Sequence, residues 1–122
     1  MLKSATLLIA LGMTPAFAQK HWTPDDAAIR RLERAVETTD WTMVLVKTAP
    51  KPLDGYDRFY GGEIIGRHHI IKGVFMDGKG SIHVLASPAG LPMILDGGCH
   101  VVSVTYDADT DTLERVACNG FG

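Results

Sequence analysis

Two cysteines constrain the fold of this chain more than any other feature, and they lie in the segment DGGCHVVSVTYDADTDTLERVACNG. Cys99 and Cys118 sit in two β-forming runs that are separated by the turn-forming residues 107–110. If these four residues form the loop, Tyr106 faces Asp111 and Cys99 falls directly opposite Cys118. The spacing therefore predicts a hairpin closed by a disulfide, which stabilises the domain by about 3 kcal/mol on the chain-entropy estimate. A reactive thiol pair and two free thiols remain the alternatives.

The same register predicts which side chains share a face of the hairpin. Val101 meets Val116 on the disulfide face, and His100 and Arg115 become diagonal neighbours on the opposite face. If that opposite face turns towards a helix, His100 and Arg115 lie over an apolar floor and form a candidate anchor for an anionic ligand or a partner's carboxylate. Alternatively, Arg115 spans the sheet edge and its guanidinium reaches water.

Three aspartates at the hairpin tip, Asp107, Asp109 and Asp111, begin like a calcium-binding EF-hand loop, in which alternate residues supply oxygen ligands. The pattern then fails, because the sixth position needs glycine and has Thr112, and the twelfth needs glutamate and has Cys118. Aspartate side chains also bond backbone N–H groups in turns. We therefore predict a turn without a metal, and a weak cation site on the three aspartates is the alternative.

Residues 1–18 have the features of a secretory signal peptide. Lys3 precedes an apolar run, and Ala16 and Ala18 form the small-residue cleavage pattern. The apolar run is too short for a helix that spans a membrane. We therefore expect cleavage to leave a single domain of residues 19–122 with no membrane span.

Charge and compartment limit the partners of the mature chain. Removal of Lys3 leaves 11 basic and 14 acidic residues, a net charge of −3, with no lysine or arginine run that would neutralise a phosphate backbone. Nucleic-acid binding is therefore not expected. An even number of cysteines in an exported chain favours a disulfide, so we expect a periplasmic or secreted protein.

One amphipathic helix is predicted near the mature amino terminus, over about residues 24–38. Thr23 is the expected N-cap, and Pro24 suits the first helical position. Apolar residues then recur every three or four positions, at Ala28, Ile29, Leu32, Ala35 and Val36. The outer, solvated face is expected to carry the charged residues Arg30, Arg31, Glu33, Arg34 and Glu37.

The chain after residue 40 is predicted to form strands with short connections. The expected strands span residues 41–46, 56–65, 68–76, 81–86, 99–106 and 111–118. Gly66 and Arg67 suit a two-residue hairpin turn, and the sequence DGKG at 77–80 gives a second turn that would place His83 near Val74. Tight hairpins make antiparallel neighbours. The predicted fold is therefore α+β, with one N-terminal amphipathic helix packed on a curved antiparallel sheet of about five or six strands.

This order of elements resembles the cystatin-like and NTF2-like folds, in which a sheet curls around an amino-terminal helix. The ending has the motifs L-P, D-G-G-C, Y-D and C-N-G, with YDRFYGG upstream, and resembles a group of small exported bacterial proteins of uncharacterised function. The resemblance implies export and a disulfide. It implies no activity, because folds of this kind host enzymes, inhibitors and ligand carriers.

The histidines do not predict a metal site. The chain has His21, His68, His69, His83 and His100. His68 and His69 are consecutive on an expected strand and therefore point to opposite faces of the sheet. Neither H-x-H nor H-E-x-x-H occurs, so exposed or half-buried strand histidines are expected.

No coherent catalytic set emerges, because no serine lies in a G-x-S-x-G motif and both cysteines are expected to be oxidised. We therefore predict a small exported non-catalytic binding module without a cofactor. Its expected partner is a protein or an envelope component, for example as an inhibitor or immunity protein. The alternative is a small periplasmic enzyme or ligand carrier with a pocket between helix and sheet. The candidate ligand-binding residues are Tyr60, His83, His100 and Arg115.

Overall fold

The computed structural model describes residues 20–39 and 52–119. The expected signal peptide and the expected strand at 41–46 lie outside these residues. Within them, no helix is both long enough and apolar enough to cross a membrane. The elements in chain order are β1 (Lys20–Trp22), α2 (Asp26–Glu37), the short 3-10 helix η2 (Leu53–Gly55), β2 (Tyr56–Ile65), β3 (His68–Asp77), β4 (Ile82–Val84), the short 3-10 helix η3 (Pro88–Gly90), β5 (Gly98–Asp107) and β6 (Thr112–Asn119).

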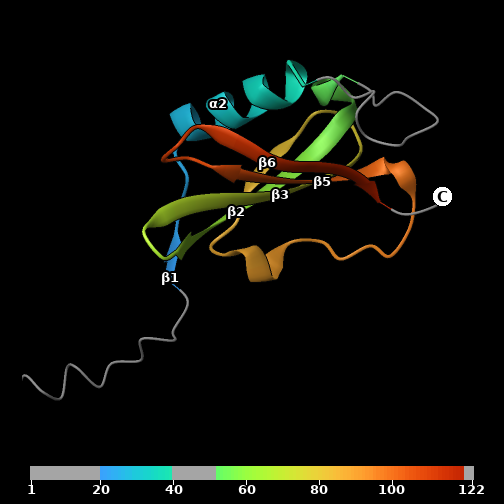
Figure 1. Ribbon diagram of the computed structural model, residues 1–122. Helices are drawn as coiled ribbons and strands as arrows, with labels where there is room; N and C mark the ends of the chain where they lie inside the picture. The colour runs from blue at the N-terminus through green and yellow to red at the C-terminus, as the bar shows by residue number, and fades with distance from the viewer. Residues whose placement is uncertain (1–19, 40–51, 120–122) are drawn as a thin grey trace, which may run out of the picture.

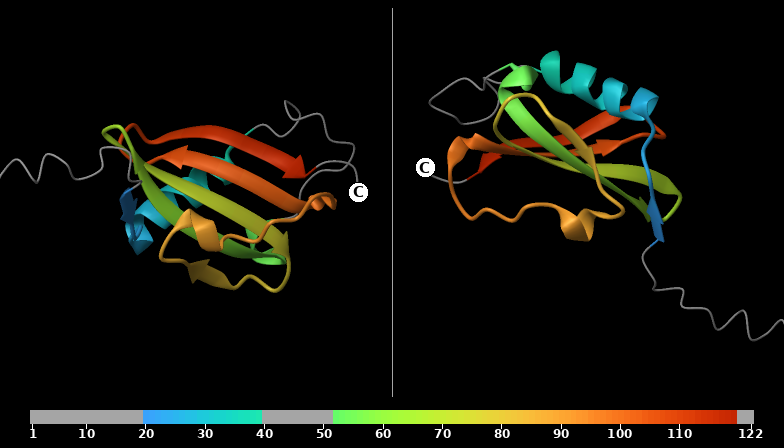
Figure 2. Two further views of the ribbon diagram at one scale, coloured as in Figure 1. Left: turned by 90° about the horizontal axis from the view of Figure 1, so that it is seen from below. Right: turned by 180° about the vertical axis from the view of Figure 1, so that it is seen from behind.

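The strands form one sheet in the order β1-β2-β3-β5-β6. The edge of β2 that faces away from β3 pairs with two short strands, β1 near its end and β4 near its middle. Every pair is antiparallel except β2 with β4. Helix α2 covers one face of the sheet, here called the inner face, and the segment that carries η3 crosses the opposite, outer face (Figures 1 and 2). The predicted α+β class is therefore confirmed.

The helix begins later than the sequence predicts, and it is not the first element, because β1 precedes it. Asp25 is the N-cap, with an extended backbone, and its carboxylate accepts a hydrogen bond from the Ala28 N–H at 2.9 Å. The predicted cap at Thr23 is therefore wrong. A carboxylate satisfies the free amide as well as a hydroxyl does and also places negative charge at the positive helix end.

The hairpin of β2 and β3 is confirmed, with Ile65 facing His68 across the two-residue turn. Gly66 takes a φ of 63°, which glycine adopts without steric cost because it has no Cβ. This turn fixes which face each side chain occupies. Alternate residues of β3 therefore point to the inner face with Ile71 or to the outer face with Ile70.

The predicted hairpin of β3 and β4 is wrong, because β4 runs parallel to β2 and His83 faces Phe59 instead of lying near Val74. Both edges of β3 are already taken, by β2 and β5, so no edge is left for β4. The Asp57 carboxylate on β2 accepts hydrogen bonds from the N–H groups of Lys79 and Ser81. These bonds hold the turn against β2, and the chain that follows the turn pairs with the free edge of β2 as β4.

The disulfide between Cys99 and Cys118 is confirmed, with Cα atoms 4.5 Å apart. At this open end of the hairpin the predicted register holds, because Gly98 faces Asn119.

The register further along the hairpin differs from the prediction. Val116 faces Val104 instead of Val101, and irregularities interrupt the pairing at two places. The loop is 108–111 instead of 107–110, because Asp107 stays in β5 and its carboxylate accepts hydrogen bonds from two backbone N–H groups of the loop. This local bonding moves the turn by one residue. The irregularity between Gly98 and Val102 then returns the pairing to the register in which Gly98 faces Asn119, next to the disulfide.

The core lies between α2 and the inner face of the sheet. The helix contributes Ala28, Ile29, Leu32 and Val36, and the sheet contributes Tyr56, Tyr60, Ile71, Phe75, Val102, Val104 and Tyr106. All of these side chains are buried. Within the described part of the chain, these side chains occupy the space between α2 and the sheet.

One ion pair interrupts this apolar layer. The Glu33 carboxylate on α2 accepts hydrogen bonds from the Arg58 guanidinium at 2.9 Å and from the Tyr60 hydroxyl at 2.7 Å. The side chains of Glu33 and Arg58 are only 15% and 10% exposed, so the prediction of Glu33 on a solvated face is wrong. Burial, the hydrogen bond to Glu33 and the charge of Glu33 raise the pKa of Tyr60, and its hydroxyl therefore stays a donor.

Tyr60 and Tyr106 give a matched test of this interaction, because both are fully buried and the Tyr106 hydroxyl has no hydrogen-bond partner within the described part of the chain. We expect Tyr60→Phe to lower the free energy of unfolding in urea by about 2 kcal/mol, as for a hydrogen bond to a charged group. Tyr106→Phe is expected to be neutral or stabilising. Equal effects of the two variants would contradict a specific role of the Glu33 bond.

Candidate functional site

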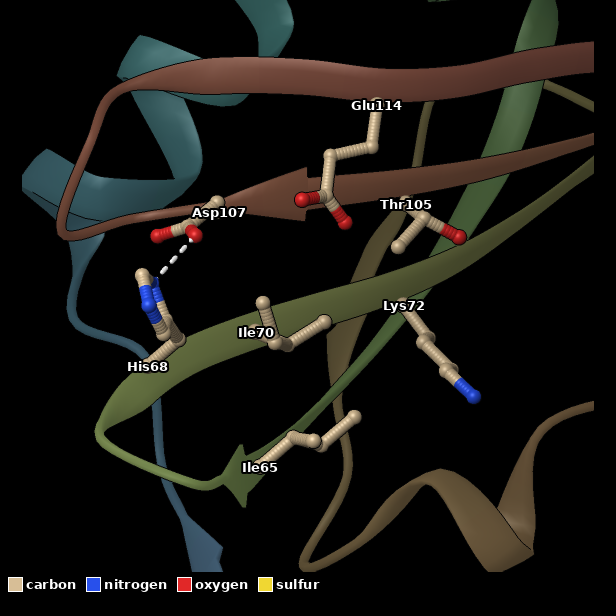
Figure 3. Close-up of a pocket in the computed structure, with 7 residues that line it drawn as sticks. All are labelled: Ile65, His68, Ile70, Lys72, Thr105, Asp107 and Glu114. Atoms are coloured by element: carbon tan, nitrogen blue, oxygen red, sulfur yellow. Dashed lines mark ion pairs between the residues drawn. The ribbon is translucent and has the colours of Figure 1, made fainter.

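An open groove of about 430 Å³ lies on the outer face of the sheet, opposite α2 (Figure 3). The end of β2 contributes Ile65, and alternate positions of β3 contribute His68, Ile70 and Lys72. β5 and β6 supply the remaining side chains, Thr105, Asp107 and Glu114. The groove thus has an aliphatic floor between β2 and β3 and a polar wall along β5 and β6.

A β-bulge turns Glu114 towards the groove. Thr105 faces Arg115, but the next residue of β5, Tyr106, faces Leu113, so Glu114 is the extra residue of β6. An extra residue breaks the alternation of side chains along a strand and re-aims one of them. Figure 3 shows the Glu114 carboxylate on the groove side of β6, next to Thr105.

Ion pairs connect the other charged side chains of the groove. His68 Nδ1 lies 2.6 Å from Asp107 Oδ2, and the Lys72 ammonium lies 3.4 Å from the Glu63 carboxylate. The Asp107 side chain is only 5% exposed, whereas His68 is about half exposed. Among the described residues Glu114 makes no ion pair, so one negative charge of the groove is uncompensated.

Two of the aspartates at the hairpin tip, Asp107 and Asp109, are held in their ionised form. Burial acts to raise the pKa of Asp107, but hydrogen bonds from the N–H groups of Thr110 and Asp109 and from His68 lower it overall. The pKa of Asp109 is also lowered, mainly by the backbone N–H and the imidazole of His69. His68 therefore contacts Asp107, and the next residue, His69, contacts Asp109.

Three potential metal ligands converge at one end of the groove. His68, Asp107 and Asp109 each offer one ligand atom, and these atoms lie within 4.8 Å of one another. The alternative site on three aspartates does not form in this arrangement, because Asp111 points to the Arg31 guanidinium at 3.6 Å. Sequence spacing does not reveal His68 as a member, because its contact with Asp107 joins two turns that are far apart in the chain.

The residues proposed from sequence as ligand contacts do not come together. Tyr60 is buried in the core on the inner face. His83 is exposed on β4, where its ring stacks on Phe59 at 4.6 Å and its Nε2 lies 2.9 Å from the Ser81 hydroxyl.

His100 and Arg115 are not diagonal neighbours. His100 Nδ1 lies 2.6 Å from an oxygen of the Asp77 carboxylate at the end of β3. Arg115 is exposed and faces Thr105, five residues along β5 from His100. The bulges shift β6 relative to the predicted register, which separates the two cations.

A second feature of the outer side is a run without Asp, Glu, Lys or Arg from position 82 to position 95, here called the uncharged segment. It begins at β4 and includes η3. Met93 and Leu95 are 86% and 88% exposed, and Ile82, Val84 and Ile94 are also exposed. The absence of Asp, Glu, Lys and Arg is visible in the sequence IHVLASPAGLPMIL, but the exposure of its aliphatic side chains is seen only in the structure.

The uncharged segment is held at its end and in its middle. The Asn119 side chain donates hydrogen bonds to the carbonyl oxygens of Ile94 and Asp96, directly after the disulfide-bonded Cys118. Towards its middle, η3 packs so closely on Gly61 of β2 that a Cβ there would lie 2.7 Å from the backbone of Pro88. The exposed aliphatic side chains are therefore presented by an anchored backbone.

No family model, curated protein or solved structure matches this chain.

The ionised Asp107 carboxylate gives a pH-dependent test. Because its pKa in the folded state lies below the value of 3.8 for a free side chain, it stabilises the fold above that pH and loses the effect as the pH falls below it. We expect Asp107→Asn to lower the free energy of unfolding at pH 7 and the difference from wild type to shrink below pH 3.8. The measurement is urea unfolding across this range, with the exposed Asp96→Asn as control. A difference that stays constant with pH would contradict this role.

Proposed function

We propose that this protein is a small non-catalytic binding module that acts outside the cytoplasm, in the periplasm or as a secreted protein. The uncharged segment is the surface that docks the partner. One observation carries the proposal: a small, charged domain exposes aliphatic side chains along 14 consecutive uncharged positions, 82–95. Exposed apolar surface of this kind is typical of interaction sites.

The chemistry of the uncharged segment favours a protein partner. It has no lysine or arginine, and the chain is acidic overall, so it lacks the electrostatic attraction that draws proteins to anionic lipid surfaces. Exposed side chains of Met93 and Leu95 suit an apolar pocket on another protein, because methionine adapts its shape to irregular surfaces. An inhibitor or immunity protein, or a binder of an envelope protein, fits this chemistry.

The anchoring of the uncharged segment supports tight binding. Ordering a loop on binding costs conformational entropy, and a backbone that is already fixed avoids part of this cost. Here the Asn119 bonds, the packing of η3 on Gly61 and the nearby disulfide fix the backbone before a partner arrives. Export also fits the disulfide, which persists in oxidising compartments.

A ligand carrier is the second candidate, and the outer groove is the observation that favours it. Its volume of about 430 Å³ is sufficient for a small ligand, and its walls combine aliphatic and ionised groups. An enzyme is less well supported, because Tyr60, His83, His100 and Arg115 lie at separate places.

Replacement of Met93 and Leu95 by serine tests the docking surface. In affinity purification from the periplasm, we expect the amount of partner that co-elutes with this double variant to fall by about tenfold or more. Aliphatic anchors that become buried at an interface contribute strongly to binding. Quantitative mass spectrometry of the co-eluting proteins measures the loss. The free energy of unfolding is expected to stay within about 0.5 kcal/mol of wild type, because both side chains are exposed.

Ile65→Ser is the matched control, because Ile65 is an exposed aliphatic residue, 53% accessible, outside the uncharged segment and at the groove. Partner binding is expected to survive this change. Loss of the partner in Ile65→Ser but not in the Met93 and Leu95 variant would overturn the proposal and favour the groove instead.

A further inference from the structure

We propose that the end of the outer groove formed by His68, Asp107 and Asp109 binds a first-row divalent metal ion of the zinc class. The site is separate from the uncharged segment, and it does not depend on the proposed function. Two independent features support it: a convergent set of nitrogen and oxygen ligands, and a cavity that opens directly onto two of these ligands.

The distances suit a small cation after a slight contraction. The three ligand atoms lie within 4.8 Å of one another. Ligands at about 2.0–2.2 Å from a zinc ion are separated by at most about 4.4 Å. A shift of under about 1 Å in side chains at the tips of two turns is therefore enough to bring all three into contact with one ion.

Existing hydrogen bonds already orient the two carboxylates. One oxygen of Asp107 accepts the N–H groups of Asp109 and Thr110, which leaves the other oxygen, 2.6 Å from the His68 imidazole, to contact the metal ion. The Asp109 carboxylate is held by the backbone N–H and the imidazole of His69. Hydrogen bonds of this kind to ligand groups are typical of protein metal sites, where they fix the orientation of the ligands.

The charge at this position also favours a cation. Asp107 and Asp109 are carboxylates, which carry negative charge at neutral pH. Glu114 adds a carboxylate to the same groove. The groove cation Lys72 is paired with Glu63, which offsets its repulsion of a metal ion. The site thus offers more negative than positive charge, as a divalent ion requires.

The ligand types select the class of metal. One imidazole nitrogen with two carboxylate oxygens suits zinc and neighbouring first-row ions, whereas calcium prefers six to eight oxygen ligands. Three protein ligands leave further coordination positions. Because His68 and Asp107 also line the groove, these positions face solvent and an incoming ligand.

Isothermal titration of the EDTA-treated and desalted protein with zinc chloride at pH 7.5 tests the proposal. We expect one zinc ion per chain, with affinity at least tenfold weaker in His68→Gln and in Asp109→Asn. His100→Gln is the matched control and is expected to bind like wild type, because His100 forms the same kind of 2.6 Å pair with Asp77 at another place. Calcium chloride is expected not to compete.

Ring nitrogen NMR spectra of the wild-type protein give a second readout that does not depend on the folding of a variant. Zinc is expected to shift the ring resonances of His68 and to leave those of His100 unchanged. Absence of saturable zinc binding would overturn the proposal. Equal loss in all three variants, or a zinc-induced shift at His100 instead of His68, would overturn it as well.

Discussion

Burial of the apolar stripe of α2 against the inner face of the sheet is the constraint on which the rest of this structure depends. It assigns one side of every strand to the core and leaves the other side for polar groups, the groove and the segment of η3. Glu33 and Arg58 form the one ion pair found within this apolar layer among the described residues, and the Tyr60 hydroxyl also donates a hydrogen bond to Glu33. They give the helix a specific position on the sheet, because a displaced helix would leave these buried polar groups unpaired.

The outer groove results from small departures from regular β-structure. Asp107 caps its own turn and stays within β5, and the bulge at Glu114 turns an acidic side chain towards the same surface. The tight turn at Gly66 then brings His68 within reach of Asp107. Each device is local, but the cluster of charged groups exists only because β3 pairs with β5 and sets the two turns side by side.

The sequence predicted the structure well in segments where apolar and polar residues alternate regularly or where turn-forming residues cluster. The strands that flank Gly66 meet the turn at the expected residues, Ile65 and His68, because a two-residue turn leaves little freedom of register. Prediction failed where two local solutions compete. Asp25 replaces Thr23 as the cap, and β4 joins β2 because β3 has no free edge. For Glu33, helical spacing alone does not reveal a buried cationic partner on a strand.

The amino-acid sequence by itself determined the α+β class, the hairpin at Gly66 and the pairing of Cys99 with Cys118, because these features follow from local propensity and short loops. Only the tertiary structure decided the register of the last hairpin, the place of β4 and the convergence of His68 with Asp107. These depend on which strand edges remain free and on the irregularities in the pairing of β5 with β6. Their energies are settled by the whole sheet instead of by any single segment.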